Sequence, residues 1–300
     1  MIFIDTFKLP NQKKINDYYA DKNISVYPWT IFFDNQFEWV ICKDITIFYG
    51  NNGSGKTTLL NLIAEKINAQ RNNALFKDVY YERYQRITPF DDFVKEIKIK
   101  MNSDDVLNEI PLPKVRKLLT SEDVFKTIDE RARRNIRTTR EIDEVRDRQD
   151  DLLHKGEGYR LQSLDDFEEF EEILEARHLS ATQYAKAHAS SKIQMQSNGE
   201  TALSIYSRAF ESGGIYLLDE PENCLSPIFQ IELIKLIQDS IKYFDCQFII
   251  CTHSPLLLSL KNSVIYNMDL IPVIPQKWTE LENTKIYYDF FKKHRYEFED

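Results

Sequence analysis

Glycine is scarce in this chain and unevenly placed. The 300-residue sequence contains eight glycines, and three of them lie in the segment Gly50-Asn51-Asn52-Gly53-Ser54-Gly55-Lys56-Thr57. This segment matches the pattern G-x-x-x-x-G-K-[ST], in which a glycine-rich loop and the helix after it surround a phosphate group. At average glycine usage, a chance match is expected in roughly one chain in a hundred of this length. The sequence therefore predicts a phosphate-binding loop between a strand and a helix.

The residues on either side of the loop support this prediction. Residues 44–49 are typical of a buried strand, and residues 57–65 carry apolar side chains three and four positions apart, as in a helix. Backbone N–H groups at the helix N-terminus would face the β-phosphate. We expect Lys56 to reach the β- and γ-phosphates and the Thr57 hydroxyl to bind Mg²⁺. The other expected cofactor-binding residues of the loop are Gly50, Asn51, Asn52, Gly53, Ser54, Gly55 and Thr58.

Two acids follow an apolar run at residues 215–220, Ile-Tyr-Leu-Leu-Asp-Glu. Such a run predicts a buried parallel strand that ends in carboxylates. We expect Asp219 to hold Mg²⁺, directly or through water, and Glu220 to act as general base on the attacking water. Read alone, the segment is better explained as a strand that ends in a helix-capping acid, and the loop upstream favours the catalytic interpretation.

A second short apolar strand, residues 248–251, ends at Thr252-His253-Ser254-Pro255. Residues 227–240 between the two strands carry a helical apolar pattern, so the interval reads as a β-α-β unit. His253 would then lie at the same edge of the sheet as Glu220. A lone histidine at a strand end is otherwise an ordinary structural residue.

The segment Ser197-Asn198-Gly199-Glu200 reads as the start of a helix over residues 200–210. A serine followed three positions later by glutamate is the pattern of a capping box. The same helix N-terminus offers N–H groups and a dipole to an anion.

Taken together and in this order, the four motifs resemble the nucleotide-binding machinery of the ABC-type ATPases. The resemblance implies that Ser197 and Gly199 contact the γ-phosphate of ATP bound to a second copy of the chain. It also implies that His253 is the switch histidine of the γ-phosphate and that Lys56, Glu220 and His253 serve catalysis. Asn198 stands where transporters usually have glycine, which favours the chromosome-maintenance and repair branch.

The resemblance can be narrowed to the small soluble bacterial ABC-type ATPases that are usually labelled AAA-family ATP-binding proteins. The similar segments are residues 219–227, 246–255, 277–283 and 287–291. The similarity extends over roughly residues 1–90 and 180–300. Larger relatives act in DNA repair and anti-phage defence.

We therefore predict an α/β fold, a P-loop NTPase of ABC-ATPase type. A mostly parallel sheet would carry the loop, with an N-terminal antiparallel β portion over residues 1–49, in one domain spanning residues 1–300. A helical subdomain inserted over residues 90–195 would carry a charged hairpin and lead to the Ser197 motif. The resemblance implies an ATP-hydrolysing, ATP-sandwiched homodimer that needs ATP and Mg²⁺ and regulates a partner in DNA repair or anti-phage defence.

Three other function classes share parts of this pattern. An ATP-gated scaffold with little turnover, controlling a nuclease or toxin effector, would have the same sequence features. A nucleotide-binding subunit of a transporter would need a membrane partner, and the Ser197 motif argues against it. A phosphoryl-transfer kinase would need neither that motif nor His253.

Charge is segregated within residues 93–185, where the strand pattern stops and the chain reads as helical. We expect a hairpin in which Gly156 and Gly158 form the turn and Leu164, Phe167, Phe170 and Leu174 face inward. In one interpretation the charged side chains of the two arms are solvated or pair with each other. In the others, the basic arm binds a nucleic-acid backbone or the hairpin docks a partner protein. The basic arm contains Arg131, Arg133, Arg134, Arg137, Arg140, Arg146 and Arg148, and the acidic arm contains Asp165, Asp166, Glu168, Glu169, Glu171, Glu172 and Glu175.

Two further roles, the linking glutamine and the aromatic residue that stacks on adenine, have more than one interpretation. Gln85, after a tyrosine-rich segment, is the candidate for the glutamine that links a core strand to the helical subdomain, although the segment equally suits an edge strand. Tyr27 or Trp29 would supply an aromatic face for adenine, or would belong to the core.

Composition limits the cellular setting. The net charge of −9 argues against general affinity for nucleic acid. No apolar run approaches the length that crosses a bilayer, and the N-terminus lacks the pattern of a signal peptide. The four cysteines lack metal-ligand spacing, so we expect free thiols in a soluble cytoplasmic protein with no membrane partner.

Overall fold

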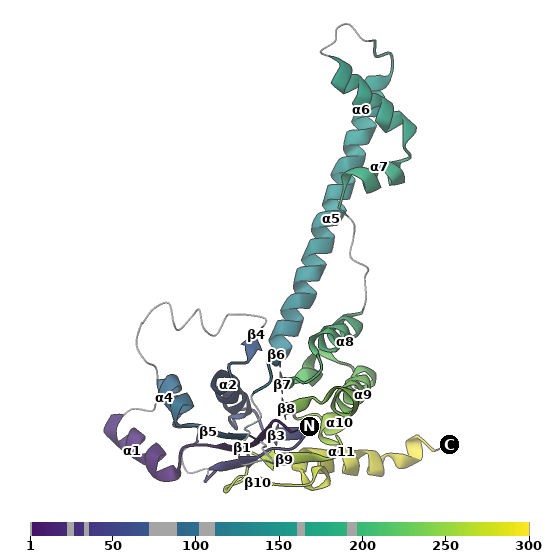
Figure 1. The fold of residues 1–300 in the computed structure, drawn as a ribbon. Coiled ribbons are helices and arrows are strands. Elements are labelled where there is room, and N and C mark those ends of the chain that lie inside the picture. The colour runs from purple at the N-terminus through teal and green to yellow at the C-terminus, as the bar shows by residue number, and fades with distance from the viewer. Residues whose placement is uncertain are drawn as a thin grey trace. The chain divides into compact units, whose positions relative to one another are not determined.

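A computed structural model describes residues 2–22, 27–32, 36–71, 89–101, 112–160, 166–190 and 197–299. The chain divides into two compact units, one formed by Met1–Phe125 with Asn198–Asp300 and the other by Lys126–Ser197. The strands are β1 (Ile4–Lys8), β2 (Trp39–Ile41), β3 (Ile45–Tyr49), β4 (Gln70–Arg71), β5 (Lys98–Met101), β6 (Arg116–Thr120), β7 (Ile215–Asp219), β8 (Gln247–Cys251), β9 (Ser263–Asn267) and β10 (Ile274–Pro275) (Figure 1). The helices are α1 (Gln12–Lys22), α2 (Lys56–Lys66), α4 (Pro89–Glu96), α5 (Ser121–Gly156), α6 (Phe167–His178), α7 (Ala181–His188), α8 (Asn198–Ala209), α9 (Pro227–Phe244), α10 (Pro255–Leu258) and α11 (Glu282–Lys293), with single-turn helices η2 (Pro221–Cys224), η3 (Trp278–Glu280) and η4 (Arg295–Glu297).

The first unit is built on a seven-stranded sheet in the order β10-β9-β3-β8-β7-β6-β4. Every neighbouring pair is parallel except β9 and β10. All five residues of β3 and of β8 are buried, which explains their continuous apolar runs, since a parallel sheet is covered on both faces. The predicted α/β fold with a mostly parallel sheet is confirmed.

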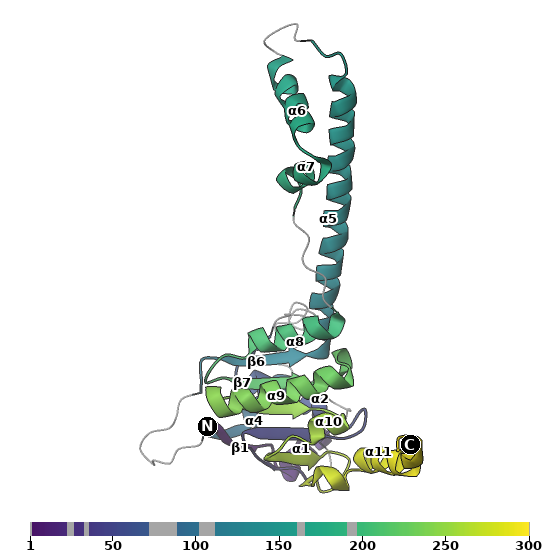
Figure 2. The same ribbon diagram turned by 90° about the vertical axis from the view of Figure 1, so that its right-hand side faces the viewer.

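Helices cover both faces of this sheet. Figures 1 and 2 show α2 on one face and α8 and α9 on the other. α2 buries eight of its eleven residues, and α9 buries Leu233 and Ile237. The helix that follows the phosphate-binding loop is therefore held along its length by apolar packing.

A second, antiparallel sheet has the order β2-β1-β5. Gln247, the first residue of β8, is fully buried and joins this sheet to the parallel one. Its Oε1 accepts hydrogen bonds from the backbone N–H groups of Phe3 (3.1 Å) and Ile4 (3.0 Å). Its Nε2 donates to the carbonyls of Ile4 (2.8 Å) and Lys43 (3.1 Å).

The strand pattern does not stop at residue 93, and the prediction of an all-helical segment from there is wrong. β5 completes the antiparallel sheet, and β6 lies between β4 and β7 in the parallel one. Of the predicted insertion over residues 90–195, the structure groups Lys126–Ser197 as a separate unit. The difference arises because the earlier part pairs with strands of the first unit.

Within the second unit, α6 runs antiparallel to α5 (Figure 2), and an apolar cluster of Leu152, Ile173, Ala176 and Tyr184 fills the space between the helices. Phe167, predicted to face inward, is half exposed, because Ile173 and Ala176 occupy the buried positions of α6.

Polar contacts also join the two arms of this hairpin. The Arg148 guanidinium donates to Glu172 at 3.0 Å, and Lys155 lies 3.6 Å from Glu169. Gln149, buried, donates to the carbonyls of Ala176 and Leu179 at 2.9 Å each. The C-terminal part of α5 is thus paired with the acidic side chains of α6.

Two further predictions concern the whole chain. Among the described helices, none has the length and apolar character that a membrane crossing requires. The cysteines at positions 42, 224, 246 and 251 are free, as predicted.

Replacement of Gln247 by methionine tests the link between the two sheets. The substitution keeps the length of the side chain but leaves four backbone groups without their partner. We expect the free energy of unfolding to fall by at least about 3 kcal/mol in urea titrations, because each unpaired buried polar group costs about 1–3 kcal/mol. Gln12→Met is the control, since the side chain of Gln12 makes an exposed hydrogen bond to Asn16, and a decrease equal to that of this control would contradict the prediction.

Candidate functional site

The predicted phosphate-binding loop joins β3 to α2. Gly55 caps α2 with a φ of 94°, in the left-handed region that favours glycine. A Cβ atom at this position would also lie 2.5 Å from the side chain of Ile31. Residue 55 is therefore restricted to glycine twice, by its backbone conformation and by its neighbour.

Lys56 lies at the first turn of α2 and is buried. Its ammonium group donates to the carbonyls of Gly50 (2.8 Å) and Asn51 (3.0 Å), so the side chain folds back over the loop. A cavity of about 260 Å³ beside it is lined by Ile31, Asn52, Gly53, Gly55, Lys56, Thr57, Thr58 and Glu220. Most of the predicted loop residues and the predicted general base thus face one cavity.

Asp219 and Thr57 lie close together. The Thr57 hydroxyl donates to Asp219 Oδ1 at 3.1 Å. The pKa of Asp219 is raised to about 6, chiefly by burial and also by the charges of Glu220 and Glu222, while the Thr57 hydrogen bond and Lys56 lower it.

These two oxygens suit a magnesium ion. Adjacent corners of an octahedron with metal–oxygen bonds of ~2.1 Å are separated by about 3 Å, so the spacing of Thr57 Oγ1 and Asp219 Oδ1 fits. A cation there would relieve the unfavourable burial of the Asp219 carboxylate. Within the described residues no three His, Cys, Asp or Glu side chains form a metal cluster, so the remaining ligands would come from phosphate and water.

Glu220 is the first residue after β7 and has a φ of 46°, a strained value for a residue other than glycine. Its backbone N–H donates to the carbonyl of Cys251, and its Oε2 accepts from the Asn223 amide at 2.9 Å. Glu220 is the N-cap of η2, and Glu222 is the second residue of that helix. Both acids therefore lie in the segment that directly follows β7.

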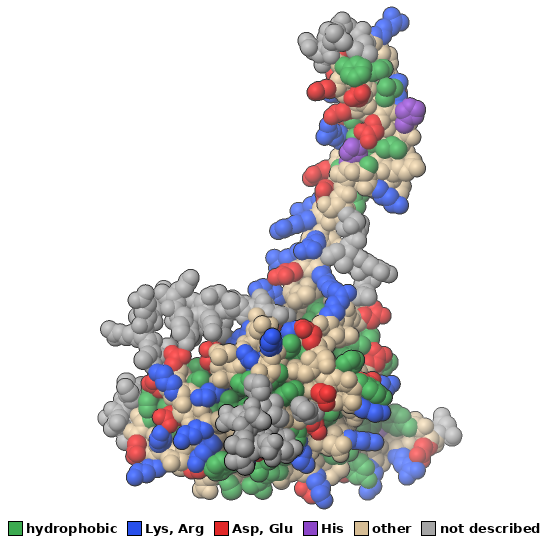
Figure 3. Space-filling view, in the orientation of Figure 1, with side chains coloured by type: hydrophobic (Ala, Val, Ile, Leu, Met, Phe, Trp, Pro, Cys, Tyr) green, Lys and Arg blue, Asp and Glu red, His purple; other side chains and the backbone are tan. Residues whose placement is uncertain are grey.

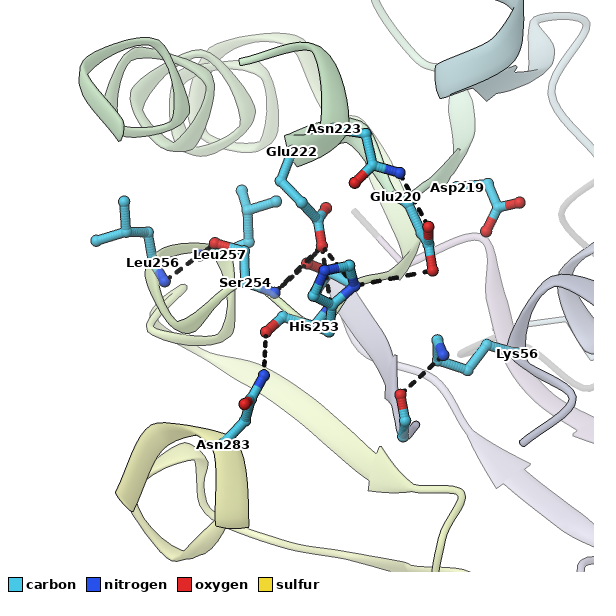
Figure 4. A network of polar contacts seen from close by, with 12 residues as sticks. Lys56, Asp219, Glu220, Glu222, Asn223, His253, Ser254, Leu256, Leu257 and Asn283 are labelled. Carbon is cyan, nitrogen blue, oxygen red and sulfur yellow. Dashed lines mark hydrogen bonds and ion pairs between the residues drawn. The ribbon is translucent and has the colours of Figure 1, made fainter. Parts of the chain in front are cut away.

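His253 lies against these two acids (Figure 4). Its Nδ1 is 3.8 Å from Glu220 Oε1 and 3.4 Å from Glu222 Oε1. The β-α-β unit thus places His253 beside Glu220, at the edge where Asp219 and the loop also lie.

The Ser197 motif opens α8, which begins at Asn198. A Cβ atom on Gly199 would lie 2.4 Å from the ring of Phe229 on α9, so this glycine is required for the packing of α8 on α9. The boundary between the two units falls between Ser197 and Asn198. The roles of Ser197 and Gly199 toward a nucleotide stay predictions.

Gln85 lies outside the described residues. The core strand that leads into the helical unit is β6, and Thr120 at its end is level with Asp219 on β7. Ser121 follows as the first residue of α5. The role of Gln85 stays a prediction.

The two aromatic candidates differ. Trp29 is buried, stacks on Tyr18 at 4.0 Å between ring centroids and donates to the carbonyl of Pro89. It belongs to the core and presents no free face to adenine. Tyr27 is half exposed, with its hydroxyl 3.3 Å from that of Thr58, so its role toward adenine stays a prediction.

Two acids of the site were not predicted. Asp269, after β9, accepts the Asn51 N–H with both carboxylate oxygens at 2.9 Å and so holds the start of the loop. Glu222 is buried and contacts residues 252–254. Neither contact has a local signal, since both join distant parts of the sequence.

Comparisons with known proteins agree with this geometry. The model of the ABC transporter family matches residues 40–223, and that of the AAA ATPase domain matches residues 202–258. No curated protein matches the chain.

Three solved structures illustrate the range of similar chains. The Smc head domain of Pyrococcus furiosus with an extended coiled coil, bound to the C-terminal domain of ScpA, is 14% identical, with 98% of this chain and 100% of that chain covered and a TM-score of 0.46. The SMC head domain of Thermotoga maritima is 13% identical, with coverage of 92% and 99% and a TM-score of 0.40. A bacterial ABC transporter cassette, described as dimeric, is 16% identical, with coverage of 83% and 92% and a TM-score of 0.34.

Replacement of Asp219 by asparagine separates stability from activity. The pKa of Asp219 is raised from 3.8 to about 6, so its charge destabilises the folded state above pH 6 and has no effect below about pH 4. We expect Asp219→Asn to raise the free energy of unfolding by about 3 kcal/mol at pH 8, with the gain shrinking as the pH falls through 6. Magnesium-dependent ATP hydrolysis should be abolished.

Urea titrations from pH 4 to 8 measure this difference, and Asp239→Asn, an exposed acid on α9, is the control. An equal or larger gain at pH 4 would show that burial of the charge is not its cause.

Proposed function

We propose, since the chain belongs to the ABC transporter family, that two copies of it close on bound ATP and that hydrolysis reopens them. The chain is an ATP-binding ATPase, in agreement with its match to the ABC transporter family and to the AAA ATPase domain. The observation that carries the proposed mechanism is the convergence of Lys56, Asp219, Glu220 and His253 at one edge of the sheet.

In this proposal the loop binds the phosphates and the strand ends perform hydrolysis. Lys56 exchanges its bonds to the loop carbonyls for bonds to the β- and γ-phosphates. Thr57 and Asp219 hold Mg²⁺, which when bound neutralises phosphate charge and orients the γ-phosphate.

Glu220 acts as general base through Oε1, because Oε2 already accepts the Asn223 amide. His253, beside that oxygen, senses the γ-phosphate.

The second copy completes the site. The helix N-terminus at Ser197 of the partner subunit, together with its Gly199, would supply N–H groups to the γ-phosphate. Asn198 in place of the transporter glycine favours a chromosome-maintenance, repair or anti-phage ATPase over a transporter subunit. The cycle would then act on a partner such as a nuclease or toxin effector.

Glu220→Gln should bind ATP normally and hydrolyse it at least about a hundredfold more slowly, because an amide cannot accept the proton of water. ATP that is not hydrolysed should hold two chains together, and light scattering with and without Mg·ATP measures the mass. Glu232→Gln, an exposed acid on α9, should behave as the unmodified protein.

A monomer under both conditions would contradict the homodimer. For a regulator with little turnover, the unmodified protein would itself form ATP-bound dimers, and their lifetime would be long because hydrolysis is slow.

A second candidate function concerns the N-terminal part of the basic arm, which contains Arg134, Arg137 and Arg140. Arg133 and Arg146 pair with acids on α5 itself, and Arg148 pairs with α6. Within the described part of the chain, Arg134, Arg137 and Arg140 have no carboxylate at ion-pair distance, and all three are exposed. Figure 3 shows basic side chains, in blue, along this helix. We propose that these three arginines contact a nucleic-acid backbone.

Replacement of Arg134, Arg137 and Arg140 by glutamine should weaken binding to all duplex DNA sequences alike. The slope of log affinity against log salt should fall by about 0.9 for each phosphate that the protein no longer neutralises. Fluorescence anisotropy over a salt series measures both effects, with Arg148→Gln as the paired control. ATP hydrolysis without DNA should be unchanged, and an unmodified protein that binds no DNA at low salt would contradict the proposal.

A further inference from the structure

Glu222 is buried, with a relative exposure of 7%, and its carboxylate contacts the residues that follow β8. A single oxygen, Oε1, accepts three hydrogen bonds: from the Thr252 hydroxyl (2.6 Å), the His253 N–H (2.9 Å) and the Ser254 N–H (3.1 Å). The other oxygen, Oε2, is buried and has no hydrogen-bond partner among the described residues. Burying a carboxyl group with one oxygen unpartnered in this way costs free energy in the folded state.

The three donors are consecutive residues around His253, which lies beyond the last residue of β8. Thr252 still donates its N–H to the Phe48 carbonyl of β3, as a strand residue would. His253 has no such backbone bond in the described structure. Its N–H is bound by Glu222 and its carbonyl by the Asn283 amide of α11, at 3.0 Å. The position of His253 is therefore set by side chains from two other elements (Figure 4).

Glu222 also belongs to the same short turn as Glu220. The turn begins at the strained Glu220, and Glu222 is the second residue of η2. His253 Nδ1 lies between the two carboxylates, 3.8 Å from Glu220 Oε1 and 3.4 Å from Glu222 Oε1. A shift of Glu222 would thus move His253 relative to Glu220.

We propose that Glu222, with Asn283 on the opposite side, is a positioning residue for hydrolysis that holds His253 in register with Glu220. This inference rests on the roles proposed above for Glu220 and His253. The hydrogen bonds of the Glu222 side chain go to residues 252–254 and not to the phosphate-binding loop, so it acts through His253.

Glu222→Gln is the sharpest test, because it keeps the shape and one acceptor oxygen but replaces charge-assisted hydrogen bonds with weaker neutral ones. We expect kcat for ATP to fall about tenfold and KM to stay within about twofold, since the loop is untouched. In a His253→Ala background the same substitution should cause no further decrease of kcat. Glu232→Gln should change neither constant.

Asn283→Ala is the second test and answers the same question if Glu222→Gln fails to fold. Asn283 is only partly buried, so the substitution removes one hydrogen bond to His253 with little effect on the core. It should lower kcat and leave KM unchanged, and this effect too should vanish in the His253→Ala background.

The outcomes separate the two proposals. If His253→Ala lowers kcat and Glu222→Gln lowers it further by the same factor in that background, the positioning role is overturned while the proposed function stands. If His253→Ala leaves kcat unchanged, the proposed role of His253 is wrong, and the positioning role falls with it. An unchanged kcat in folded Glu222→Gln also overturns the inference.

Discussion

The hydrogen-bonded register of β3, β8 and β7 is the constraint on which the site depends. Cys251 on β8 is level with Phe48 on β3 and with Asp219 on β7. The phosphate-binding loop, the two acids and His253 each follow one of these strands within a few residues. Because the strands are parallel, all three continuations emerge at one edge of the sheet. A shift of one residue in either pairing would separate the acids from the loop.

The site carries unfavourable features that the surrounding core has to offset. Glu220 adopts a left-handed conformation, the Asp219 carboxylate is buried with a raised pKa, and Glu222 leaves one buried oxygen without a partner among the described residues. Each of these costs free energy in the folded state. The fully buried β3 and β8 provide the packing against which these groups are held. Such a concentration of strain is typical of a site selected for chemistry rather than for stability.

The sequence predicted the parts of the site whose signal is local. Continuous apolar runs that end in polar residues marked β3, β7 and β8, and a glycine-rich spacing marked the loop. β6 was missed because only Leu118 and Leu119 are buried in it, after two basic residues. Gln247 and Asp269 were missed for a different reason. Their partners lie 243 and 218 positions away, so no local pattern reveals the contacts.

The order of the strands has a consequence for the growing chain during synthesis. Both neighbours of β3 in the sheet, β8 and β9, are made about two hundred residues later than β3 itself. β1 likewise waits for Gln247 before its first backbone groups are paired. The apolar strand that precedes the loop therefore leaves the ribosome without either partner. It must be kept from aggregation until most of the chain has emerged, and shortened chains that end before β8 would lack both His253 and the strand that lies between β3 and β7.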